Sequence, residues 1–200
     1  MRIISVLLFM LMILTGCSGS TAFPTDENFH FETDAQSYSF GQGESRSIAE
    51  SETGYYFSML LGGFYYLFYA DKDTMEPVPV CSKPNCMHYE ETDQEKRELC
   101  NAHVTGIPGS GIFYYNGKLY LPEYSLTGNE TEINEYSLDG TVRKTLFSLK
   151  EKSYFSSDML FHRGYFYVAS NTYDEETNAL LQVWRYSLDR PAQKGELLFE

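Results

Sequence analysis

Four side chains that commonly bind metal ions lie in one short stretch of the sequence: Cys81, Cys86, His88 and Cys100. Three thiolates and one imidazole make up the Cys₃His ligand set of a tetrahedral structural zinc site. Pro84-Asn85 is typical of a turn, and a turn there would bring Cys81 and Cys86 together. The spacings, Cys-x₄-Cys and Cys-x-His, are similar to those of zinc knuckles only in general form. The stretch therefore predicts a zinc site.

A disulfide between two of these cysteines is the alternative, because exported domains fold under oxidising conditions. Cys81–Cys86 and Cys86–Cys100 are both feasible pairs, and the sequence does not determine the connectivity. Either pair would leave one thiol over, and this odd count favours a metal ion; three unlinked thiols are the remaining alternative. A zinc ion with four protein ligands has no open position for a substrate, so we expect the cluster to hold a long loop in place and not to catalyse a reaction.

The first 16 residues predict a lipoprotein signal peptide. Arg2 supplies a minimal positive region, and Ile3 to Leu14 is an apolar segment shorter than the roughly 20 residues that span a bilayer. Leu14-Thr15-Gly16-Cys17 resembles the lipobox of bacterial lipoproteins, which implies acylation of Cys17 with fatty acids such as palmitate and cleavage before it. Several acyl chains on Cys17 would anchor the chain to the cell membrane on its extracytoplasmic face. The alternative is an ordinary signal peptide with an incidental cysteine.

Charge and polarity limit the partners and divide the chain. The formal net charge is −13, which argues against nucleic acid as a partner because a phosphate backbone needs a basic surface. Residues 17–50 are polar and poor in aliphatic side chains, so they predict a lipidated cysteine followed by a flexible tether. Aromatic and polar residues alternate between Phe29 and Phe40, and an edge strand is the alternative for that part.

Residues 51–200 predict an all-β domain. Aromatic residues make up 16% of the chain and occur in short runs, which is typical of strands. Three pairs of such runs flank dipeptides that favour tight turns, and Asn-Gly in particular tolerates the positive φ of a type I′ hairpin. These dipeptides are Gly62-Gly63, Asn116-Gly117 and Arg163-Gly164.

The order of elements repeats along this domain. Tyr-Ser-Leu-Asp ends a long predicted strand at Tyr136–Asp139 and again at Tyr186–Asp189, 50 residues later. Antiparallel four-stranded units of about 40–50 residues are typical of β-propeller blades, and a meander or sandwich is the alternative. In the first of these strands, Ile133 and Tyr136 should face opposite sides of the sheet. About three blades can be counted, fewer than the 4 to 8 of most closed propellers, so we expect an incomplete, truncated or open β-propeller-like domain.

These features together resemble a family of propeller-like lipoproteins of unknown function from Gram-positive bacteria. The resemblance is carried by the lipobox, the aromatic hairpins, the segment Val78–His88 and the later Cys100-Asn101-Ala102, and it spans most of Gly54 to Glu200. Val80 stands where the family more often has Leu. The resemblance implies a propeller fold but no activity, and the greater length of most members implies that this chain is truncated.

No catalytic motif accompanies these repeats: the sequence has no glycine-rich phosphate loop, Gly-x-Ser-x-Gly elbow or His-Glu-x-x-His helix. We therefore expect a non-enzymatic, membrane-anchored binding or scaffold module, whose partner would be a protein, a peptide or a glycan. One alternative is part of a carbohydrate-active or other hydrolytic propeller enzyme. Another is a surface protein that handles zinc or redox equivalents through the cysteine cluster.

Overall fold

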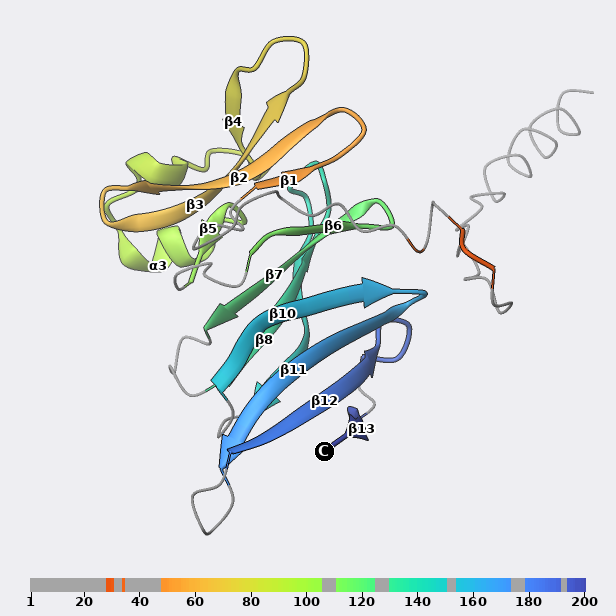
Figure 1. Ribbon diagram of the computed structural model, residues 1–200. Coiled ribbons are helices and arrows are strands. Elements are labelled where there is room, and N and C mark those ends of the chain that lie inside the picture. The colour runs from red at the N-terminus through yellow and green to blue at the C-terminus, as the bar shows by residue number, and fades with distance from the viewer. Residues whose placement is uncertain are drawn as a thin grey trace, which may run out of the picture.

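Strands dominate the computed structural model, which describes residues 28–30, 34, 48–105, 111–124, 130–150, 154–173, 179–191 and 194–200. They form three antiparallel sheets in chain order (Figure 1), which confirms the all-β prediction. The predicted four strands per sheet are present, and the first sheet has a fifth; the described strands do not close into a ring. The predicted signal peptide of residues 1–16, Cys17 and most of the predicted tether lie outside these ranges. None of the helices within them is long and apolar enough to span a bilayer.

The second and third sheets are meanders, in which each strand pairs with the next along the chain. The second sheet comprises β6 (Phe113–Tyr115), β7 (Lys118–Tyr124), β8 (Glu130–Tyr136) and β9 (Arg143–Lys150). The third comprises β10 (Tyr154–His162), β11 (Tyr165–Tyr173), β12 (Ala179–Ser187) and β13 (Glu196–Phe199). The predicted turns join the first two strands of each sheet, with φ of 50° and 71° at Asn116 and Gly117 and 45° and 77° at Arg163 and Gly164. A type I′ turn requires this left-handed backbone at both central residues.

The first sheet differs because its last strand is interrupted. It comprises β1 (Ile48–Glu50), β2 (Gly54–Leu61), β3 (Phe64–Asp71), β4 (Pro77–Pro79) and β5 (His103–Val104). Strand β2 pairs with all of β3 along one edge, so β4 and β5 share the other edge. There β4 lies opposite Phe68–Ala70, and β5 lies opposite Tyr65 and Tyr66. Strand β1 lies within the range assigned to the tether, so the sheet begins before the predicted boundary at residue 51.

Residues 80–102, the inserted loop, leave the sheet between β4 and β5 and return to the same point. Both ends of the loop bind Leu67 of β3: the Val80 N–H donates to the Leu67 carbonyl at 2.9 Å, and the Leu67 N–H donates to the Ala102 carbonyl at 2.7 Å. The two ends therefore form a closed neck opposite one residue. The loop contains the short helices η2 (His88–Glu90) and α3 (Gln94–Glu98).

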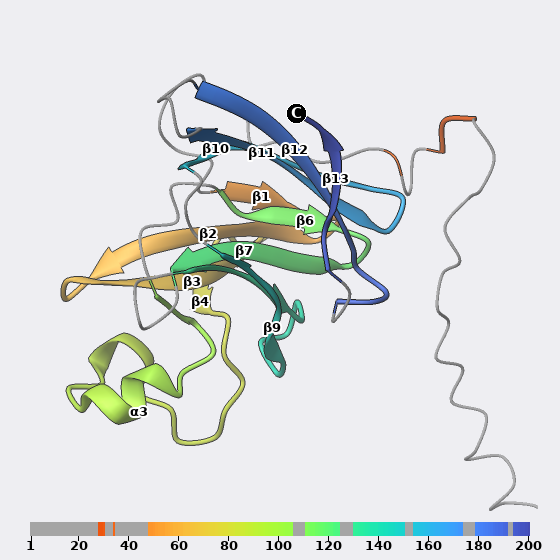
Figure 2. The same cartoon turned by 90° about the horizontal axis from the view of Figure 1, so that it is seen from below.

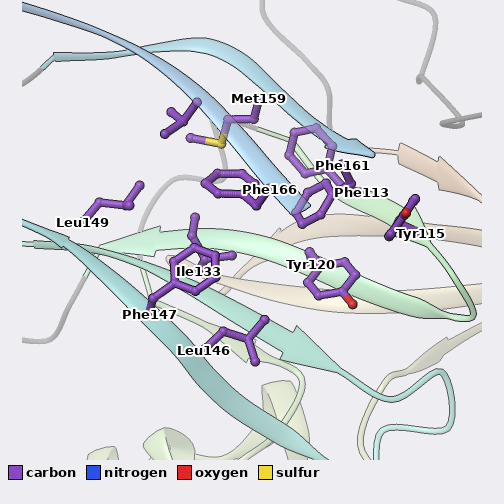
Figure 3. Packing of buried hydrophobic residues seen from close by; sticks show 11 residues of the cluster. Phe113, Tyr115, Tyr120, Ile133, Leu146, Phe147, Leu149, Met159, Phe161 and Phe166 are labelled. Carbon is purple, nitrogen blue, oxygen red and sulfur yellow. The ribbon is translucent and has the colours of Figure 1, made fainter. Parts of the chain in front are cut away.

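The three sheets pack face to face in chain order. Between the first and second sheets, Leu67 packs in one buried cluster with Leu119 and Tyr136. Between the second and third sheets, Ile133 packs in another with Phe161 and its aromatic neighbours (Figure 3). Ile133 and Tyr136 thus face opposite sides of β8, which confirms the prediction from alternation.

The inserted loop covers the outer face of the first sheet. Tyr66 and Phe68, which alternate with Leu67 along β3, pack there against Cys81 and Cys100 in a third buried cluster. Figure 2 shows the loop and α3 beside β3 and β4, on the side away from β10–β12. The residues that could bind a metal are thus part of the packing of this face.

A short part of the predicted tether contacts the third sheet. The Asp34 carboxylate accepts hydrogen bonds from Arg163 Nε at 2.8 Å and Nη2 at 2.7 Å, in the turn between β10 and β11. The Asn28 carbonyl also accepts a hydrogen bond from Arg163. Asn28 and Asp34 are therefore held against a hairpin that lies about 130 residues further along the sequence.

Candidate metal centre

Cys81, Cys86, His88 and Cys100 come together at the neck of the inserted loop. Cys81 and Cys100 lie beside the two ends of the loop, which the hydrogen bonds of Leu67 hold together. The four possible ligand atoms, one from each side chain, lie within 4.8 Å of one another. The residues singled out in the sequence are therefore close enough to hold one metal ion.

The turn predicted at Pro84-Asn85 is present and brings Cys86 back toward Cys81. The Cys86 N–H donates to the Lys83 carbonyl at 3.4 Å, and Asn85 has a φ of 60°. Asparagine tolerates this left-handed conformation better than most residues. A local turn therefore explains how two cysteines on one segment reach the same site.

His88 and Cys100 have the spacing of two ligands on one zinc ion. His88 has a φ of 52°, and its Nδ1 atom lies 3.6 Å from Cys100 Sγ. With a Zn–S distance of about 2.3 Å and a Zn–N distance of about 2.0–2.1 Å, tetrahedral geometry places sulfur and nitrogen about 3.6 Å apart. Two sulfur ligands are about 3.8 Å apart in the same geometry, so closing the 4.8 Å cluster requires a contraction of about 1 Å.

The environment of the cluster lowers the pKa of the Cys81 thiol and favours a neutral imidazole at His88. Burial raises the pKa of the Cys81 thiol, but hydrogen bonds from two backbone N–H groups and from the thiols of Cys100 and Cys86 outweigh this effect and lower it. Burial raises the pKa of Cys100 to about 12, so that thiol is protonated in the metal-free chain. Burial also lowers the pKa of His88, which keeps the ring neutral, as a metal ligand must be.

This ligand set fits zinc and not the hard cations. Thiolate and imidazole are ligands that zinc prefers, whereas Mg²⁺ and Ca²⁺ take oxygen. Cys81 and Cys100 are buried, and Cys86 and His88 are half-buried, so an ion here would be largely shielded from water. In the described part of the chain, the three cysteines are free and no disulfide joins them.

A second polar cluster, which the sequence did not indicate, lies where the chain leaves the inserted loop. The Glu123 side chain has no exposed surface, and its Oε2 atom lies 2.9 Å from Arg143 Nη2. Arg143 Nη1 donates to the His103 carbonyl of β5 at 2.7 Å. The Glu123 carboxylate also accepts hydrogen bonds from the side chains of Asn134 and Tyr136 and from the N–H of Thr105. The cluster therefore ties β5 of the first sheet to the second sheet.

The other predicted site residue, Cys17, lies outside the described residues, so its lipidation stays a prediction. Comparisons of the chain with protein-family models, with curated proteins and with solved structures give no match.

Proposed function

We propose that the chain binds one zinc ion through Cys81, Cys86, His88 and Cys100, and that the ion is structural. The observation that carries this proposal is the convergence of four ligand atoms within 4.8 Å at the neck of the inserted loop. Cys81 and Cys100 come from opposite ends of the loop, so one ion would crosslink its entry and its exit. Such a crosslink would hold the loop against the outer face of the first sheet.

A structural role follows from the number of ligands. Catalytic zinc keeps one position for water or substrate, and four protein ligands leave none. The loop also carries packing, because Cys81 and Cys100 are part of the buried cluster with Tyr66 and Phe68. The ion therefore acts on the fold, by fixing a surface, and not on a bound substrate.

The test is to measure zinc and free thiols in the purified chain from residue 22 to residue 200, which lacks Cys17. Elemental analysis is expected to find one zinc per chain, and titration after unfolding is expected to find three thiols. In a His88→Ala variant the zinc is expected to fall while the three thiols remain. One thiol without zinc would show a disulfide in place of the metal, and three thiols without zinc would show that the cysteines are not linked.

We further propose that this zinc-held fold is a propeller-like binding or scaffold module, anchored by lipid at Cys17 on the outer face of the cell membrane. The support is the sequence Leu14-Thr15-Gly16-Cys17 and the repeat of antiparallel sheets, with no catalytic motif in the sequence. Its partner would be a protein, a peptide or a glycan that contacts the exposed loops.

Replacement of Cys17 by Ser is expected to release the protein from the membrane fraction of a bacterial host. The serine hydroxyl is not the thiol that the lipid transfer requires, so labelling with a fatty-acid analogue should be lost as well. Ser18→Ala is the matched control, because it changes the next residue and keeps the thiol. Membrane retention and labelling of the Cys17→Ser variant would contradict the anchor.

A further inference from the structure

We infer that the turn between β8 and β9 of the second sheet is a template for the zinc site, so that zinc binding and the docking of the first two sheets stabilise each other. This inference rests on the proposed zinc site and assigns positioning roles to Asn101 and Gly140, neither of which is a ligand. It concerns the contact between the metal-binding loop, which belongs to the first sheet, and the second sheet.

One carbonyl group of this turn binds both ends of the inserted loop. Asn101, next to the ligand Cys100, donates from Nδ2 to the Gly140 carbonyl at 2.8 Å and to the Thr141 carbonyl at 3.3 Å. Ser82, next to the ligand Cys81, donates its N–H to the same Gly140 carbonyl at 3.4 Å. The residues beside both ligands, Cys81 and Cys100, therefore bind the same oxygen atom of the second sheet.

The fit of Gly140 against the loop is close. A Cβ atom at Gly140 would lie 2.5 Å from Cys81 N and 2.7 Å from the Val80 carbonyl oxygen, closer than side-chain carbons come to such atoms. The φ of Gly140 is 69°, which glycine adopts without strain. The backbone of the turn therefore touches the backbone of the first ligand directly.

The turn is braced by its own side chains as well as by the loop. Asp139 Oδ1 accepts hydrogen bonds from Ser137 Oγ at 2.7 Å and from the Thr141 N–H at 3.0 Å. Ser137 Oγ in turn accepts the Val142 N–H at 2.9 Å. A turn braced in this way can help to position Cys81 and Cys100, and the ion would hold the turn in place in return.

Outer contacts of this kind tune metal affinity because they hold ligands in place, and their loss typically weakens binding about 10–100-fold. Coupling between two equilibria is reciprocal, so whatever the turn adds to zinc affinity the zinc adds to the docking of the turn. Removal of zinc should therefore loosen residues 137–142, although none of them is a ligand.

The experiment measures zinc affinity by competition with a chromophoric chelator in the wild type and in Asn101→Ala. We expect the dissociation constant to rise about 10–100-fold in Asn101→Ala. The matched control is Gln94→Ala, which removes a side-chain amide of the same loop that bonds to Glu98 within α3; its affinity should equal that of the wild type. If Asn101→Ala does not fold, Ser137→Ala decides, because it unbraces the turn without changing the loop and should also weaken binding.

Hydrogen exchange provides the reciprocal readout. The amides of residues 137–142 are expected to exchange faster after zinc is removed from the wild type. Equal zinc affinity in Asn101→Ala and the wild type, or exchange in this turn that is unchanged by zinc, would overturn the coupling and leave the zinc site standing. A wild type that binds no zinc would overturn both proposals.

Discussion

Replacing Cys100 with Ser is expected to lower the free energy of unfolding by about 4 kcal/mol when free zinc exceeds the wild-type dissociation constant about 1,000-fold. An ion that binds only the folded state stabilises it in proportion to the logarithm of its free concentration divided by its dissociation constant. The variant lacks one of the four side chains that bind zinc, so it loses this stabilisation. Urea unfolding at fixed free zinc measures the difference.

The same pair of proteins in excess chelator is the control. Without zinc, the change from sulfur to oxygen alters the packing and the polar contacts of one small buried side chain but removes no bond to a metal, so the two proteins should then differ less. An equal difference with and without zinc would show that Cys100 acts through packing alone. Because zinc must displace the proton of Cys100, whose pKa burial raises to about 12, zinc stabilisation should fall as the pH is lowered.

Replacing Arg143 with Ala is expected to destabilise the fold by about 3–5 kcal/mol, because it leaves the carboxylate of Glu123 buried without its counter-charge. That side chain has no exposed surface in the intact protein, so its charge depends on the groups around it. The variant also loses the hydrogen bond to the His103 carbonyl, which links β5 to the second sheet. Thermal or urea unfolding of the zinc-loaded protein measures the loss.

Two further variants separate burial from simple loss of an ion pair. Arg185→Ala breaks the pair between Arg185 Nη2 and Glu196, which is shorter, at 2.6 Å, but much more exposed, so its loss should cost at most about 1 kcal/mol. Adding Glu123→Gln to Arg143→Ala removes the unpaired charge and should recover part of the lost stability. An Arg143→Ala variant no less stable than Arg185→Ala would contradict a structural role for the buried pair.

The elements that the sequence predicted are those with a local cause. Asn116-Gly117 and Arg163-Gly164 predict their hairpins because tight turns require positive φ, which few residue pairs tolerate. The alternation around Ile133 placed its neighbours on the correct faces because it follows from strand geometry alone. The cluster of cysteines with His88 was visible because metal ligands are few residue types at short spacing.

What the sequence did not predict depends on contacts between distant segments. Strands β4 and β5 have three and two residues, too few to show the alternation of polar and apolar side chains that marks a strand. Only their pairing with the same edge of β3 shows that they are two parts of one interrupted strand. Glu123 follows the apolar run Leu119–Pro122, so its burial could be suspected from the sequence. Its partner Arg143 lies two strands away in the sheet, so the pair could not be predicted. The close approach of Gly140 to Cys81 likewise could not be predicted, because it depends on how the first two sheets pack together.

X-ray absorption at the zinc edge tests the central claim most directly, because it reports the atoms bound to the ion. We predict three sulfur atoms at about 2.3 Å and one nitrogen at about 2.0–2.1 Å, with the nitrogen lost in His88→Ala. A first shell made only of oxygen and nitrogen would contradict it, because the ion would then be bound away from Cys81, Cys86 and Cys100.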